Sequence, residues 1–150
     1  MGKHIALVGC GGAQPAGVVA GKDGNGNTRT TVTGLEAAAP EHGAPVFTFD
    51  TVDIAESFTS RLFGLMGKQD IPDGYCILFP RCTSVHTAFM RCPIDVLYIR
   101  TDGRMVGYET LPPWKLGHAP IGTQAVVECR AGTMRKHGID DGEPIMLREL

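Results

Sequence analysis

The part of the chain after residue 45 shows apolar residues at short, regular intervals that are typical of β-strands. Residues 46–55 alternate for the most part between apolar and polar side chains, which predicts a strand with room for a bulge. Residues 75–79 form a continuous apolar run, which favours a strand buried on both faces. The same reasoning predicts further strands at residues 84–90, 94–99, 105–108, 125–129 and 144–147.

Turn formers and two helical patterns complete this picture. Asp102-Gly103 separates two of the expected strands and predicts a β-hairpin. A short helix is expected at residues 57–66, where apolar residues share one helical face, and another at residues 131–137, ended by Gly138. We therefore expect a mainly β fold, namely a small antiparallel β-sandwich or partly open barrel with two short helices.

Residues 1–45 depart from this pattern. From Gly9 to Pro45 the chain is rich in Gly, Ala, Pro, Asn and Thr, and it lacks Phe, Tyr and Trp. A segment with so little apolar surface gains little from packing to offset the entropy lost on ordering. We expect a flexible Gly/Ala/Pro-rich leader over residues 1–45 and a single β-rich domain over residues 46–150.

The first twelve residues allow three interpretations. Lys3 to Gly12 is similar to a strand entering a glycine-rich turn, as in dinucleotide-binding folds, but the required βαβ unit does not follow. Leu7-Val8-Gly9-Cys10 resembles a lipoprotein cleavage box with Cys10 as the lipidated residue, although the apolar stretch before it is short for a signal peptide. A truncated start would complete that signal. The third interpretation is a locally packed or frayed N-terminal strand.

Length and charge limit the partners that the chain would meet. A chain of 150 residues corresponds to about one domain. Its formal net charge of -2 gives no field that attracts phosphate backbones, which argues against nucleic acid as a partner. No apolar run approaches the roughly 18–20 residues that cross a bilayer, so we expect no transmembrane segment in the chain as given. The location stays open between the cytoplasm and, if Cys10 belongs to a truncated signal, the cell envelope.

A series of short motifs shares its order and spacing with one known family. These motifs are Arg61 with Gly64-Leu65-Met66, Leu78-Phe79, His86-Thr87, Met90 to Val96, Asp102-Gly103, Pro113-Trp114, and Glu128 with Ala131-Gly132. In them the chain resembles the prokaryotic domain of unknown function 192 family, and in particular its branch with a short His-Thr, Met, Pro-Ile-Asp segment. The resemblance implies a β-sandwich-like fold, frequent export or envelope association, and no established activity. Residues before Val46 match nothing in the family.

The cysteines give little support for a metal site. Their number is odd, which argues against a complete disulfide framework; they are Cys10, Cys76, Cys82, Cys92 and Cys129. A zinc site built from Cys82, His86 and Cys92 would lack the close pair of ligands that structural sites use. Cys76 stands in an apolar run, where a small buried side chain is the simpler explanation. We therefore expect neither a metal ion nor another cofactor.

Three side chains are candidates for acid–base chemistry, namely His86, Asp95 and Glu128. A small hydrolase or transferase would need them to converge near a nucleophile. No nucleophile motif of the Gly-x-Ser-x-Gly type is present. A strand histidine bonded to the backbone is the plainer role for His86.

The two carboxylates also have structural explanations. Asp95 stands in an otherwise apolar strand, and a buried carboxylate requires a partner, for which Arg91 or Arg61 would serve. Glu128 would cap the second helix or pair with Arg130 or Lys136. The sequence leaves these structural roles and the catalytic role open.

The segment Leu111 to Lys115 carries the only tryptophan, Trp114, and precedes a loop with Gly117, Pro120 and Gly122. It is either a recognition loop, since tryptophan is favoured in tight contacts, or a lid that closes one end of the barrel.

We expect a non-enzymatic binding or assembly module, with a hydrolase or transferase as the alternative and a purely structural domain as a third option. Its partner would be a protein, of the kind that takes part in secretion or pilus assembly. The expected contact surface comprises His86, Thr87, Met90, Arg91, Asp95, Trp114 and Glu128.

Overall fold

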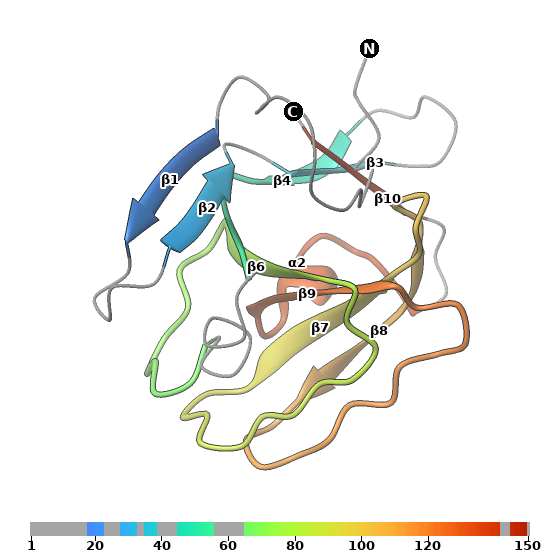
Figure 1. Cartoon of the computed structure of the whole chain (residues 1–150). Helices are drawn as coiled ribbons and strands as arrows, with labels where there is room; N and C mark the ends of the chain where they lie inside the picture. The colour runs from blue at the N-terminus through green and yellow to red at the C-terminus, as the bar shows by residue number, and fades with distance from the viewer. Residues whose placement is uncertain are drawn as a thin grey trace.

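The computed structural model describes residues 18–22, 28–32, 35–38, 45–55, 65–141 and 145–149, and it is built mainly of β-strands (Figure 1). The expected mainly β class is confirmed. The elements are β1 (Val18–Lys22), β2 (Thr28–Val32), β3 (Leu35–Ala38), β4 (Pro45–Phe49), β5 (Thr51–Ile54), β6 (Tyr75–Pro80), β7 (Ile94–Ile99), β8 (Met105–Leu111), β9 (Ala125–Arg130), α2 (Thr133–Lys136) and β10 (Met146–Glu149).

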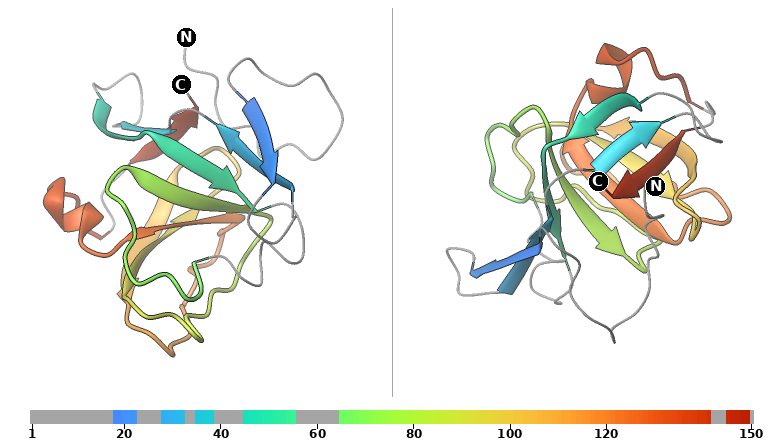
Figure 2. Two further views of the ribbon diagram at one scale, coloured as in Figure 1. Left: turned by 90° about the vertical axis from the view of Figure 1, so that its left-hand side faces the viewer. Right: turned by 90° about the horizontal axis from the view of Figure 1, so that it is seen from above.

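The strands form two sheets that pack as a partly open sandwich. The large sheet has the order β1-β2-β5-β6-β9-β7-β8, and the small sheet has the order β10-β3-β4. Figure 2 shows the small sheet lying across the large one. Among the described strands, β5 and β6 pair in parallel and the other pairs are antiparallel. The large sheet ends in β1 and β8, so it does not close into a barrel.

Each face of the large sheet buries its own hydrophobic core. The first core lies between the sheets, where Phe49 and Leu147 of the small sheet meet Leu97 of the large one. The second core lies on the opposite face, where Ile77 and Val96 pack with Leu65 and Met90 from the segments before and after β6. Successive residues of a strand point to opposite faces, so strands between two cores must be apolar throughout. This explains the continuous apolar run of β6 and the mainly apolar strands β7 and β9, in which Asp95 and Glu128 are the buried exceptions.

The strand expected at residues 46–55 is two strands that belong to different sheets. The chain bends at Asp50, which leaves β4 in the small sheet and β5 in the large sheet. Gly74 makes this corner possible, because it has a φ of 74° and a Cβ there would lie 2.6 Å from an Asp50 carboxylate oxygen. The Thr51 N–H also donates to the Gly74 carbonyl oxygen over 3.1 Å. Phe49 of β4 and Val52 of β5 both face the first core, so the inward-facing positions change from odd to even residue numbers at the bend.

Three other local predictions have different outcomes. The expected helix at residues 131–137 is confirmed as α2, with Met134 buried. The expected helix at residues 57–66 lies almost wholly outside the described residues. The expected strand at residues 84–90 is wrong, because this segment makes only an isolated bridge between His86 and Leu116 and then turns, with the Met90 N–H bonded to the Thr87 carbonyl oxygen. The polar and apolar residues alternate there because Val85 and Thr87 point inward, although no described strand pairs with this segment.

Strand pairing also crosses the boundary that the sequence analysis places at Val46. β1 and β2 extend the large sheet beside β5, and β3 lies between β4 and β10. Ala37 and Ala38 of β3 are fully buried, so small side chains fit where the aromatic signal of a strand is missing. A flexible leader stays a prediction for the residues before Val46 that are not described. Among the described helices, none has the length and apolarity needed to span a bilayer.

Candidate functional site

Two aromatic side chains, Phe89 and Trp114, stand together on the surface at one end of the large sheet. Their exposed fractions are 62% and 63%, and their ring centroids lie 4.7 Å apart in an edge-to-face arrangement. Burying a large aromatic side chain is worth about 2 kcal/mol, so displaying two of them forgoes a stabilising contribution. Aromatic residues in this position are typical of contact surfaces.

Both aromatic residues also have a left-handed backbone conformation. The φ angle is 61° at Phe89 and 63° at Trp114. For a bulky L-residue this conformation costs about 1–2 kcal/mol. The surrounding structure must hold both residues against this cost, and such strain gathers at functional sites.

Thr87 holds the two aromatic turns together. Its side chain is fully buried, and its hydroxyl group donates to the Pro112 carbonyl oxygen over 2.7 Å and accepts from the Lys115 N–H over 2.8 Å. Its own N–H donates to the Lys115 carbonyl oxygen, and its carbonyl oxygen accepts from the N–H groups of Trp114 and Met90. One residue therefore fixes the backbone on both sides of the aromatic pair.

The loop that follows Trp114 has a second anchor on the large sheet. Glu109 accepts hydrogen bonds from the Tyr98 hydroxyl group and from the His118 N–H. The Gly117 N–H donates to the Val85 carbonyl oxygen over 2.9 Å. Gly117 also packs so closely against the Tyr98 hydroxyl group that a Cβ would collide with it. These contacts fix the loop after Trp114 at Gly117 and His118 and leave the two aromatic rings outside.

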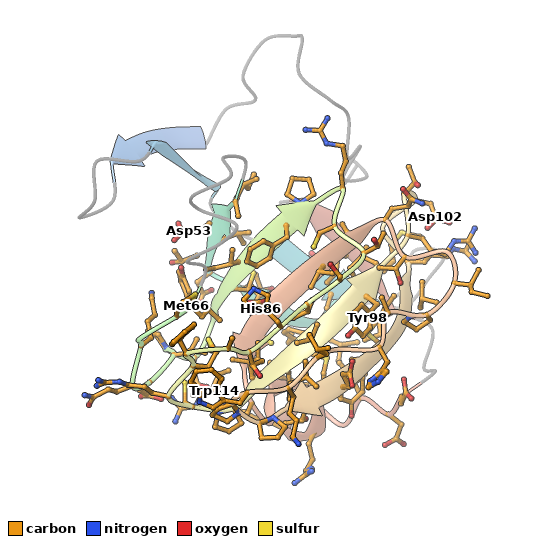
Figure 3. The ribbon with its side chains drawn as sticks, turned by 60° about the horizontal axis from the view of Figure 1, so that its bottom comes forward. Asp53, Met66, His86, Tyr98, Asp102 and Trp114 are labelled. Carbon is orange, nitrogen blue, oxygen red and sulfur yellow. The ribbon has the colours of Figure 1, made fainter. Side chains whose placement is uncertain are left out.

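The Phe89–Trp114 surface consists of the exposed side chains at this end: His86, Phe89, Arg91, Trp114, Lys115 and Leu116. Leu116 is 71% exposed and bridges to His86. In Figure 3, Trp114 lies at the lower rim of the sheet and Asp102 lies at the far end. The expected contact residues Thr87 and Met90 are buried beneath this surface and support it.

Asp95 lies in β7 away from this surface, with 1% of its area exposed. One carboxylate oxygen accepts from the Thr110 hydroxyl group over 2.7 Å, and the other accepts from the Met134 N–H over 3.0 Å. Asp95 thus supplies the acceptor for the first turn of α2, where the N-cap Gly132 has no side chain. The expected need for a partner is confirmed, but neither partner is an arginine. Arg61, the other expected partner, lies outside the described residues.

Glu128 lies in β9 and points into the second core. Its neighbours across the strands are Ile77 and Val96, and the side chain makes no hydrogen bond or ion pair with the described residues. Burial raises the pKa of Glu128 to about 8. The expected pairs with Arg130 and Lys136 are wrong, because these cations bind carboxylates elsewhere on the surface.

The three candidate catalytic residues are therefore not brought together. Asp95 faces the core between the sheets, Glu128 faces the opposite core, and His86 is exposed. A shared acid–base site would require them on one side of the sheet.

The described cysteines are free thiols, two of them buried and two half-buried. Cys76 and Cys129 face each other across β6 and β9, and burial raises the pKa of both thiols. The Cys82 thiol donates to the Ser84 carbonyl oxygen and the Cys92 thiol to the Lys68 carbonyl oxygen. In the described ranges no group of three or more His, Cys, Asp or Glu side chains is placed to hold a metal ion. Cys10 lies outside the described residues.

A hollow at the other end of the large sheet is a weaker candidate for a functional site. It lies between the β7–β8 turn and the loop before β9, where it is lined by Arg100, Asp102, Val106, Ile121 and Gln124. It has no buried polar group that would orient a ligand. The Phe89–Trp114 surface is the stronger candidate.

The family model named domain of unknown function 192, described as Uncharacterized ACR, matches residues 39–147. The chain belongs to this family. The resemblance seen in the sequence is thereby confirmed, and the family is an uncharacterised one. Its matched range starts before Val46 and includes β4 and β5 as well as the Phe89–Trp114 surface.

Archaeal relatives support the same membership. A UPF0127 protein of Thermococcus kodakarensis is 28% identical over 98 residues, which cover 63% of this chain and 62% of that protein. A UPF0127 protein of Pyrococcus horikoshii is 38% identical over 71 residues, which cover 43% of this chain and 59% of that protein. The chain thus spans less than two thirds of the length of these two relatives.

Two solved structures share the fold. A protein of unknown function from Novosphingobium aromaticivorans matches with a TM-score of 0.65 and 19% identity, covering 90% of this chain and 99% of that one. A Sinorhizobium meliloti protein, named as a proposed transcription regulator, matches with a TM-score of 0.62 and 22% identity, covering 76% and 92%. At these identities the likeness is one of fold alone.

Phe89 is the candidate site residue that sequence reasoning does not identify. The alternating pattern placed its side chain on the same strand face as Val85 and Thr87, which are buried. The turn after Thr87 instead gives Phe89 a positive φ and sends its ring outward beside Trp114. No turn former stands at this position, so the sequence carried no signal for it.

Proposed function

We propose that this protein is a binding module that recognises a protein partner through the Phe89–Trp114 surface. The observation that carries the proposal is an exposed aromatic pair held in a strained backbone conformation by a buried threonine. A surface that is fixed before binding loses little conformational entropy when the partner arrives. In protein interfaces a few residues, with aromatic ones prominent among them, carry most of the binding energy.

The proposal also includes a cellular location, the cell envelope. Family resemblance suggests envelope association, and a partner in secretion or pilus assembly would place the module there. The lipidation of Cys10 belongs to the same proposal, since it would tether the module to a membrane. The separation of Asp95 from Glu128 favours binding over the hydrolase or transferase alternative.

The test uses a photo-crosslinking amino acid placed at Phe89 in the native host. We expect an adduct of defined mass whose partner can be identified by mass spectrometry. The same amino acid at Thr101, an exposed position on the β7–β8 turn, serves as the matched control and should give no such adduct. Trp114→Ala should abolish the adduct from position 89, and His86→Ala should weaken it. Equal adducts from both positions would contradict the proposal.

A further inference from the structure

The two segments that frame the aromatic pair carry positive charge only. Residues 81–93 and 111–124 contain Arg81, Arg91 and Lys115, together with His86 and His118, and neither segment contains Asp or Glu. The whole chain has 16 acidic residues against 14 Lys and Arg, so this end differs in sign from the molecule as a whole. An oriented charge distribution of this kind selects partners of opposite sign.

The cations beside the rings are unpaired within the described ranges. Lys115 directly follows Trp114 and Arg91 lies two residues after Phe89; both are exposed, and neither forms an ion pair with a described residue. By contrast, Arg130 binds Asp70 and Lys136 binds Asp73. Glu109, the acidic residue nearest in sequence to the loop, is already bonded to Tyr98 and His118. The surface therefore keeps cations available for an incoming carboxylate.

Resting on the proposed function, we infer that the partner presents an acidic peptide segment to this surface. Its carboxylates pair with Arg91 and Lys115, and an apolar side chain between them packs against Phe89 and Trp114. The planar guanidinium of Arg91 can bind a carboxylate through two hydrogen bonds. A nucleic acid fits less well, because its long phosphate backbone would also meet the acidic remainder of the molecule.

Trp114 provides a direct readout, because it is the only tryptophan of the chain and 63% of it is exposed. The probes are three ten-residue peptides with capped ends, in which leucine alternates with glutamate, glutamine or lysine. We expect the glutamate peptide to shift the Trp114 emission to shorter wavelength in a saturable titration. The glutamine peptide should bind at least tenfold more weakly, and the lysine peptide should give no shift.

Matched variants assign the charge contribution. Arg91→Gln and Lys115→Gln should each weaken binding of the glutamate peptide by about twofold to fivefold, as expected for exposed charge pairs. Arg135→Gln, at an exposed cation on α2, should leave the affinity unchanged. Raising the salt concentration should reduce the affinity of the unchanged chain for the glutamate peptide. It should have little effect on a variant that carries both Arg91→Gln and Lys115→Gln. Equal binding of the glutamate and glutamine peptides would overturn the inference.

The remaining outcomes separate the two proposals. A crosslinked partner at Phe89 without any preference for the glutamate peptide would remove the acidic partner and leave the binding module standing. A shift of the Trp114 emission by polygalacturonate or by anionic lipid vesicles, with none by the glutamate peptide, would likewise overturn the peptide assignment. Absence of both the adduct and the shift would remove the module as well.

Discussion

Asp95 and Glu128 lie on neighbouring strands of the large sheet, but their side chains point to opposite faces. Cys129 pairs with Asp95 and Val96 pairs with Glu128, so a shift of one position separates the two carboxylates by the thickness of the sheet. Asp95 is satisfied by Thr110 and Met134, whereas Glu128 stands among apolar side chains. The two acids therefore have independent effects on stability, and each can be tested alone.

Replacing Asp95 should weaken the attachment of α2 to the sheet. Asp95→Ala leaves the Thr110 hydroxyl group and the Met134 N–H without their acceptor, at a cost of about 2–3 kcal/mol in the free energy of unfolding. Asp95→Asn keeps one acceptor oxygen and should cost about half as much. Urea unfolding followed by circular dichroism measures both values. Equal stability of Asp95→Ala and the unchanged chain would refute the capping role.

Glu128 should make the protein less stable as the pH rises. Burial raises the pKa of its carboxyl group from 4.5 to about 8 in the folded state, so folded chains retain a proton that unfolded chains release. Stability should be highest below pH 4.5 for this group alone, fall between pH 4.5 and 8, and level off above pH 8, a loss on the order of 5 kcal/mol. Glu128→Gln should remove this slope. A pH series of urea titrations on both chains would show the same slope if Glu128 is not responsible.

Thr87→Val tests the support of the aromatic pair. Valine matches threonine in shape but leaves the Lys115 N–H without its acceptor, which should cost about 1–3 kcal/mol. The loop should also become more mobile, which lowers the fluorescence anisotropy of Trp114. Thr83→Val, at an exposed position in the same segment, is the control and should change neither value. An unchanged anisotropy in Thr87→Val would show that other contacts hold the loop.

Phe89→Gly should separate stability from binding. Glycine adopts a φ of 61° without steric cost, so the change relieves strain of about 1 kcal/mol while it removes the exposed ring. We expect a midpoint of thermal unfolding that is unchanged or slightly higher, together with loss of partner binding. Phe89→Leu keeps the strain but loses the ring, so it should show no such gain in stability. Retained binding in both variants would exclude Phe89 from the contact surface.

The sequence was sufficient for the β class and for the central strands, because those strands carry long apolar runs or a clear turn signal. The hairpin of β7 and β8 around Asp102-Gly103 is the best example. It was not sufficient for β3, whose alanines show no strand preference and become buried only because β4 and β10 lie on either side. Residues 35–38 therefore form a strand because of their pairing partners, of which β10 lies far away in the sequence.

The candidate site was predicted in part for the same reason. His86, Arg91 and Trp114 do lie at one end, since they flank segments that the Thr87 hydrogen bonds join. The sequence also groups Asp95 and Glu128 with these residues. A sequence pattern shows that each strand contains a polar residue, but it does not show whether polar residues of two different strands lie on the same face of the sheet. Strand register, which depends on the whole sheet, settled that question.

The small sheet is complete only when β10, the last described strand in the sequence, has joined it. Leu147 of β10 pairs with Ala37 of β3, and together with Phe49 they cover the first core. Contacts between segments so far apart in sequence form slowly, because a long loop must close first. During synthesis the part of the large sheet that β10 covers thus stays exposed until residues 146–149 have left the ribosome, and over that interval the nascent chain has an apolar surface that a chaperone would recognise.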